Sequence, residues 1–118
     1  MLVLGLQGSP RKKGNSNYLM QLFLERARQR GARTQVVDTA HRKISPCREI
    51  GLCETDGHCP IKDDMLFEVY GLLREADIVV TATPVFFYNM SAQLKAMIDR
   101  CQTLWARKYR LRLKDPGA

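Results

Sequence analysis

The sequence predicts an α/β fold, in which helices cover both faces of a parallel β-sheet. Two observations predict it: short apolar runs alternate with longer segments of helical periodicity, and Gly or Pro separates most of them. Such β-α-β-α-β-α alternation favours parallel strands joined by right-handed crossovers. The 118 residues, 45% hydrophobic and 26% charged, suffice for one core, so we expect a single domain over residues 1–118.

The first half of the chain predicts a strand, a helix and a second strand. Residues 2–6 are a buried strand that ends in a Gly-Ser-Pro turn, and residues 33–37 are the second strand. Between them lies a helix over residues 17–30, which Asn15 or Ser16 can cap and Gly31 ends. Its apolar stripe consists of Leu19, Phe23 and Ala27, with Met20 and Leu24 alongside.

The second half continues the alternation after a long, cysteine-bearing connection at residues 39–62. Asp63 or Asp64 can cap a helix that runs to about Glu75. Residues 78–83 are a third buried strand, ended by proline. The inward side of the helix before it is formed by Met65, Val69, Leu72 and Leu73. Ser91 then opens a last helix, whose apolar side consists of Leu94, Met97, Ile98, Cys101 and Trp105.

The net charge, the hydropathy and the cysteine content limit which binding partners and which cellular location are expected. Nineteen Lys and Arg against 12 Asp and Glu give a net charge of +7, which suits nucleic acid, an acidic surface or an anionic small molecule. The basic residues at 26–33 and 107–114 are typical of solvated helix ends or a tail, so we expect no nucleic-acid interface. No apolar run approaches the ~20 residues of a membrane span, and no export signal is present, so we expect no membrane association and a cytoplasmic location. Disulfides are not expected there.

The loop from Gly8 to Asn17, between the first strand and the first helix, predicts a phosphate site. It matches neither a Walker A motif nor a dinucleotide fingerprint. Free amides at the helix start, the helix dipole, the Ser9 and Ser16 hydroxyls and the Arg11 charge all converge where a phosphate dianion can bind. A solvated turn with a well-made helix cap is the alternative.

The loop from Thr83 to Met90 predicts a site for a planar ligand. Phe86, Phe87 and Tyr88 are consecutive, and three adjacent aromatics cannot all be buried on one face of a regular element. A loop packed on the last helix is the alternative. In open α/β sheets the ligand lies outside the carboxyl ends of the strands where the strand order reverses, and both loops fall there. A phosphate beside one loop and a flat ring beside the other describe a mononucleotide.

These residues closely resemble the NADPH-dependent FMN reductase family of flavodoxin-like proteins. The resemblance rests on Gly8-Ser9-Pro10-Arg11, on Gly14-Asn15-Ser16-Asn17 and on residues 83–100. Residues 45–65 are similar to the family's iron-sulfur flavoprotein-like branch. The resemblance implies a doubly wound sheet of order 2-1-3, incomplete beside the five strands of the order 2-1-3-4-5.

The resemblance also implies a cofactor and an activity. FMN is expected to bind through its phosphate at Ser9, Arg11, Gly14, Asn15, Ser16 and Asn17. Its ring is expected at Pro84, Val85, Phe86, Phe87, Tyr88 and Asn89. NAD(P)H is the implied co-substrate, from which hydride passes to the flavin, so that no side chain is named as catalytic. The alternatives are an electron-transfer flavoprotein that does not use nicotinamide directly, and an inactive fragment.

Two departures from the family's sequence pattern limit how far its properties can be expected in this chain. The iron-sulfur branch has a compact array of four cysteines, whereas this chain has Cys47, Ile50, Cys53 and Cys59 in the corresponding positions, so we expect no four-cysteine cluster. A cluster on Cys47, Cys53 and Cys59 is the less favoured alternative. The chain also stops after three predicted strands. We therefore expect either a C-terminally truncated piece or a partner chain, most simply a second copy, on the free edge of the third strand.

Overall fold

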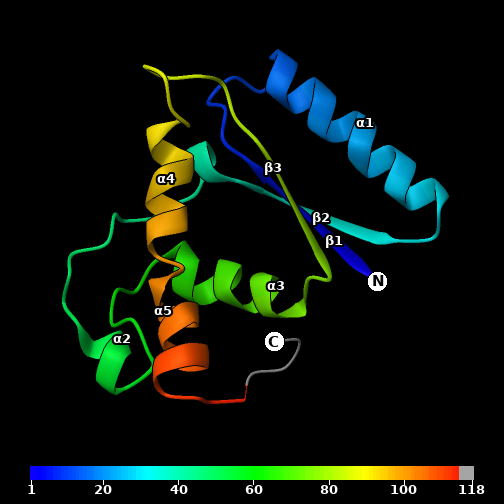
Figure 1. Ribbon diagram of the computed structural model, residues 1–118. Helices are drawn as coiled ribbons and strands as arrows, with labels where there is room; N and C mark the ends of the chain where they lie inside the picture. Colours follow the sequence, from blue (N-terminus) through cyan, green and yellow to red (C-terminus); the bar gives the residue numbers. More distant parts are fainter. Residues whose placement is uncertain (115–118) are drawn as a thin grey trace.

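A computed structural model of the chain describes residues 1–114. It contains a three-stranded parallel sheet in the order β2-β1-β3, which confirms the predicted α/β, flavodoxin-like arrangement (Figure 1). The strands are β1 (Leu2–Gln7), β2 (Arg33–Asp38) and β3 (Ile78–Ala82). The longer helices are α1 (Asn15–Gln29), α3 (Tyr70–Glu75) and α4 (Ala92–Asp99), and the short ones are α2 (Leu52–Thr55) and α5 (Gln102–Trp105). No helix within residues 1–114 is both long and apolar enough to cross a bilayer.

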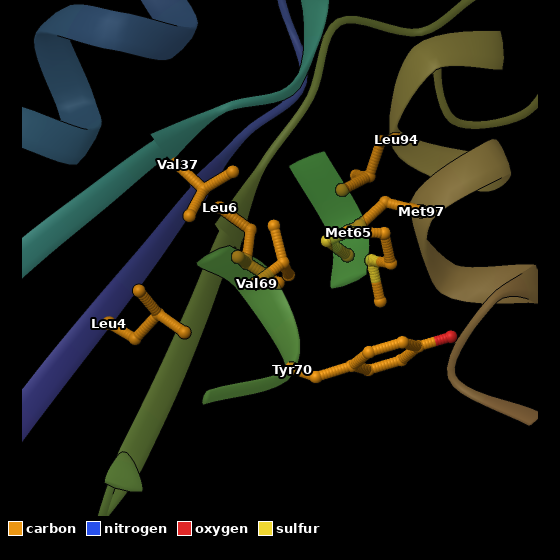
Figure 2. Close-up of a cluster of buried hydrophobic side chains, with 8 residues drawn as sticks. All are labelled: Leu4, Leu6, Val37, Met65, Val69, Tyr70, Leu94 and Met97. Carbon is orange, nitrogen blue, oxygen red and sulfur yellow. The ribbon is translucent and has the colours of Figure 1, made fainter. Parts of the chain in front are cut away.

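Helices cover the two faces of the sheet, α1 on one side and α3 with α4 on the other (Figure 1). Alternate side chains of β1 project to opposite faces, so Leu4 and Leu6 belong to one buried cluster and Val3 to the other. Figure 2 shows the larger cluster, where strand residues meet Met65 and Val69. Its other buried members are Val37, Tyr70, Leu94 and Met97. The sheet is thus a layer between two helical layers.

Helix α1 packs closely on β1 because Gly5 has no side chain. A Cβ at Gly5 would lie 2.6 Å from Met20 Sδ. The predicted stop is confirmed, since Gly31 adopts the left-handed φ of 91° just beyond the helix. The predicted cap is wrong: the helix begins at Asn15 with Gly14 as its N-cap, so Asn15 and Ser16 lie inside the first turn. The first turn therefore starts without the side-chain acceptor that the sequence suggested.

The predicted apolar stripe of α1 is only partly buried. Met20 and Leu24 are in the core, whereas Leu19 is 63% and Phe23 47% exposed. These two side chains face a shallow groove that continues along β3 over residues 80–83. The stripe extends past the edge of the sheet because, among residues 1–114, no further strand lies beside β3.

Strand β3 is one of the two edge strands within the described residues, and it is not buried as predicted. Ile78 and Val79 remain about half exposed, although the sequence IVVTA is apolar enough for the centre of a sheet. Burial of a central strand requires neighbours on both sides, and β3 pairs with β1 alone within the described residues. The sequence pattern indicates that the strand is suited to the centre of a sheet. Its actual exposure depends on which strands lie beside it.

The later helices are less regular than their periodicity suggests. The helix predicted from Asp63 to Glu75 begins with a π-helical turn, Met65–Val69, and its inward residues pack as expected. Asp63 Oδ1 accepts hydrogen bonds from the amides of Met65 and Leu66, at 3.1 and 3.4 Å, so the expected cap is confirmed. The last helix is interrupted near Arg100, and a second π-helical turn follows at Ala106–Arg110. Trp105 is half exposed, which contradicts its predicted inward position.

A buried arginine ties the long connection to the rest of the fold. The side chain of Arg100 is 1% exposed, and its Nη1 donates to Asp63 Oδ2 at 2.7 Å and to the carbonyl of Ser45 at 2.9 Å. Asp63 Oδ2 also accepts from the Ser45 amide at 2.8 Å. Burial lowers the pKa of Arg100, but the hydrogen bond and charge of Asp63 outweigh it and leave that pKa above the ordinary value. The charged pair therefore holds both ends of the connection against α4.

Candidate functional site at the carboxyl edge of the sheet

The two loops predicted as a site lie side by side at the carboxyl ends of β1 and β3. The amide of Gly8 donates to the carbonyl of Ala82 at 2.7 Å. The fully buried Ser91 hydroxyl donates to the carbonyl of Gly8 at 2.6 Å and accepts from the Leu94 amide at 3.3 Å. Ser91 thus caps α4 and at the same time locks the second loop to the first.

Replacement of Ser91 with alanine is expected to lower the free energy of unfolding by about 2–3 kcal/mol. This sums a lost helix cap, about 1 kcal/mol, and a buried carbonyl left without its partner, about 1–2 kcal/mol. Urea unfolding of both proteins measures the change. Thr55→Ala is a matched control, because its exposed hydroxyl bonds only to the nearby Leu52 carbonyl, and it is expected to cost under about 0.5 kcal/mol. Equal midpoints for Ser91→Ala and wild type would show that the lock contributes nothing.

The first loop is organised by short-range hydrogen bonds. Ser9 is buried, its amide donates to Gln7 Oε1 at 3.0 Å, and its Oγ accepts from the Arg11 amide at 3.1 Å. Asn17 Nδ2 donates to the carbonyl of Lys12 at 2.6 Å and closes the loop over the start of α1. The loop is therefore preformed, with exposed Arg11 and Lys12 on its outer side.

The start of α1 fits an anionic group. The first amides of a helix lack intrahelical partners, and within residues 1–114 no side chain accepts from them at the Gly14 cap. The first turn contains no acidic residue, so nothing there opposes a negative ligand. Of the predicted phosphate ligands, Ser9 is buried, Gly14, Ser16 and Asn17 are partly exposed, and Arg11 and Asn15 are exposed. These donors suit a phosphate, and the predicted ligand roles stay predictions.

The second loop forms a tight turn with two aromatic residues at its tip. Phe86 and Asn89 exchange backbone hydrogen bonds of 2.8 and 3.0 Å. Phe87 and Tyr88 between them adopt left-handed φ angles of 43° and 66°, a conformation that favours Asn and Gly in such turns. Their rings meet edge to face at a centroid distance of 5.6 Å and are 94% and 93% exposed. These two rings therefore do not pack on α4, which removes for them the alternative raised from the sequence.

The remaining predicted ring contacts lie around the same turn. Pro84 is partly exposed, and Val85 and Asn89 are exposed. Exposed aromatic rings are costly in water, and a planar ligand stacked on them would cover part of that surface, although the backbone strain would remain. Because Gly8 and Ala82 are hydrogen-bonded, the aromatic turn and the phosphate loop extend from the same edge of the sheet.

Gln7 is a site residue that sequence reasoning missed. It is 3% exposed at the end of β1, and its Oε1 fixes the Ser9 amide. Its Nε2 has no hydrogen-bond partner among the described residues. A glutamine at the carboxyl end of an otherwise apolar strand is the signal that could have found it, because a buried amide there must serve the loop.

The cysteines lie away from this edge. Cys47, Cys53 and Cys59 line one pocket with Ile50 and Arg100, on the side of α2 and α5. Cys101 is separate, at the end of α4, where burial raises the pKa of its thiol to about 11. Cys101 is therefore protonated at neutral pH and is a packed core residue, as the sequence indicated. All of these thiols are free.

A parallel α/β sheet in the order β2-β1-β3, with two adjoining loops at the carboxyl ends of β1 and β3, is the arrangement of a flavodoxin-like protein. The profile of the NADPH-dependent FMN reductase family matches residues 1–114. The chain belongs to that family, a class of flavoprotein oxidoreductases.

The curated proteins that resemble this chain are named as flavoproteins, in agreement with the family. The chain is 40% identical to an iron-sulfur flavoprotein of Archaeoglobus fulgidus over 108 residues, which cover 92% of this chain and 54% of that protein. It is 38% identical over its whole length to the iron-sulfur flavoprotein of Methanosarcina thermophila, covering 61% of it. It is 36% identical, again over its whole length, to an iron-sulfur flavoprotein of Methanocaldococcus jannaschii, covering 60%. The chain thus spans a little over half the length of these relatives.

Proposed function

We propose that the chain binds FMN at the carboxyl edge of its sheet. Family membership supports the identity of the cofactor. The preformed loop at the uncapped start of α1 supports a phosphate held by Ser9, Arg11, Gly14, Asn15, Ser16 and Asn17. The exposed aromatic turn supports a ring held by Pro84, Val85, Phe86, Phe87, Tyr88 and Asn89. The observation that carries the proposal is the hydrogen-bonded junction between these two loops.

The activity proposed is that of an NAD(P)H-dependent flavin reductase. When bound, FMN would supply a hydride acceptor for the nicotinamide of NADPH or NADH. The protein side chains orient the ring and exclude water from it, and no side chain is assigned an acid-base role. The four free cysteines suit a reducing cytoplasm, which we propose as the location.

Steady-state oxidation of NADPH and NADH tests this activity. The purified chain is mixed with FMN under anaerobic conditions, and nicotinamide absorbance is followed. Oxidation that depends on both protein and FMN is expected. A protein that binds FMN, fails to oxidise either nicotinamide and yet accepts electrons singly from a one-electron donor is the electron-transfer alternative. A folded protein that binds no FMN is the inactive fragment.

We also propose that the chain self-associates through the outer edge of β3. Its backbone groups are unpaired on that side within the described residues, and the strand contains no proline or lysine to discourage pairing. The adjacent groove exposes Leu19 and Phe23. A second copy paired at β3 covers both.

Sedimentation equilibrium over a dilution series measures this association, and a dimer that dissociates on dilution is expected. Val79→Lys, which places a charge on the exposed edge, is expected to weaken the dimer by roughly tenfold or more. Phe67→Lys is a matched control, because Phe67 is also exposed but lies on the π-helical turn before α3. A monodisperse monomer at every concentration, with cooperative unfolding, contradicts the proposal.

A further inference from the structure

The donor set of the cysteine pocket does not fit a four-iron cluster. Such a cluster takes four thiolates, about one for each iron. Cys47, Cys53 and Cys59 line the pocket, and Ile50, which offers no ligand atom, lines it with them. Within residues 1–114, no group of three or more His, Cys, Asp or Glu side chains is placed to hold a metal ion. The thiols share a pocket without converging on a point.

Hydrogen bonds from other parts of the chain hold the loop that carries these thiols. At its two ends, the Lys43 amide donates to Asp64 Oδ2 at 2.7 Å and the Lys43 carbonyl accepts from the Asp64 amide at 3.0 Å. The buried Arg100 adds its bonds to Asp63 and to the Ser45 carbonyl. This clamp of hydrogen bonds closes the loop at both ends.

The middle of the loop is fixed from the last helical segment. Arg107 Nη1 donates to the carbonyl of Gly57 at 2.9 Å. Gly57 has a left-handed φ of 78°, and a Cβ there would lie 3.2 to 3.3 Å from Leu113, Arg107 and Leu111. Close packing on that side fixes this part of the loop against the last helical segment.

We infer that this chain retains the cysteine loop of its iron-sulfur relatives as a metal-free structural segment, positioned by Arg100 and Arg107. The segment has no complete thiolate set, because Ile50 stands where a fourth thiol is needed. The proposed flavin chemistry then proceeds without an iron centre in the same chain. This inference concerns metal content and loop stability, so it stands or falls independently of flavin binding.

Anaerobic reconstitution with iron and sulfide tests the inference. The Methanosarcina thermophila iron-sulfur flavoprotein, treated in parallel, shows that the procedure loads a cluster. After desalting, this chain is expected to retain under about 0.5 iron per chain, against about four for a complete cluster. Its spectrum after reduction is expected to contain no paramagnetic cluster signal. Near four irons per chain with a reducible chromophore, or three with the signal of a three-iron cluster, overturns the inference.

Two variants extend the test to the loop itself. The triple variant Cys47→Ser, Cys53→Ser, Cys59→Ser removes every thiol of the pocket and is expected to unfold within about 3 °C of wild type, with no response to chelator. A loss of 10 °C or more on this substitution, or a chelator-dependent fall in the wild-type midpoint, contradicts a metal-free segment. Ile50→Cys supplies the fourth thiol. Iron uptake by this variant but not by wild type shows that the ligand count decides, and no uptake by either shows that the clamp keeps the thiols apart.

Discussion

Replacement of Asp63 with alanine is expected to lower the free energy of unfolding by about 3–5 kcal/mol, because it leaves the Arg100 guanidinium buried without its counter-charge. Asp63 is 10% and Arg100 1% exposed, and two hydrogen bonds of 2.7 and 3.2 Å join them. At about 4 °C per kcal/mol for a chain of this size, the midpoint of thermal unfolding falls by roughly 12–20 °C. Differential scanning calorimetry and urea titration measure both quantities.

The partly exposed pair Arg42–Glu68 is the matched control for this substitution. Its charged groups lie 3.0 Å apart, but both side chains are about one-third exposed. Glu68→Ala is expected to cost under about 1 kcal/mol. Similar losses in the free energy of unfolding for Asp63→Ala and Glu68→Ala would show that burial of the Arg100 pair does not increase its effect on stability.

The same pair predicts how stability depends on pH. Burial alone raises the pKa of Asp63, but hydrogen bonds from Arg100 and Ser45 outweigh it and hold that pKa below its ordinary value of 3.8. The folded state therefore binds fewer protons than the unfolded state near this pH, and stability rises with pH. The contribution is complete above about pH 5 and is lost as the pH falls through the folded pKa. The gap between wild type and Asp63→Ala is expected to narrow in acid, and a constant gap down to pH 2 would contradict it.

Replacement of Arg11 with alanine is expected to weaken FMN binding by roughly 10- to 150-fold, equivalent to about 1.5–3 kcal/mol for one charge-assisted phosphate contact. Arg11 lies on the outer side of the loop before α1, and its backbone amide donates a hydrogen bond to the Ser9 hydroxyl. Arg11 is close to the start of α1, because a Cβ at the Gly14 cap would lie 3.5 Å from Arg11 Cβ. Quenching of flavin fluorescence during titration gives the dissociation constants.

Riboflavin and Arg26→Ala are the controls for the phosphate contact. Riboflavin lacks the phosphate, so its affinity is expected to be the same for wild type and Arg11→Ala. Arg26 lies near the C-terminal end of α1, where it donates a hydrogen bond to Gln29. Its removal changes the net charge by the same amount as removal of Arg11 but leaves the loop intact. If Arg11→Ala and wild type bind FMN equally, the phosphate is held elsewhere. A uniform fall for both arginine variants would indicate long-range attraction only.

Local signals in the sequence predicted the strands, the order of the elements and the position of both loops. Apolar periodicity and the Gly and Ser punctuation are properties of short segments, and the caps at Asp63 and Ser91 followed from them. The exposure of Leu19, Phe23 and Trp105 did not follow, because periodicity shows which side of a helix is apolar but not whether anything covers it.

The features that sequence reasoning missed depend on contacts between distant segments. The Ser91 hydroxyl meets the Gly8 carbonyl 83 positions away, and Arg100 meets Ser45 across 55 positions. Nothing local to either residue indicates such a partner. The π-helical turn at Met65–Val69 is equally hidden, because an i,i+5 bond changes the helical phase without changing composition. The proposed ligand roles of Ser9 to Asn17 and Pro84 to Asn89 remain predictions for the binding experiments.

The left-handed turn at Phe87 and Tyr88 has a consequence for directed evolution of this protein. Two bulky residues hold a backbone conformation that Asn-Gly adopts with little strain. A library selected only for survival at high temperature should therefore enrich Asn and Gly at these positions. A library selected for flavin retention should keep the rings and recover heat resistance elsewhere. Opposite results from the two selections would show that thermal stability and flavin binding favour different residues at the tip of this turn.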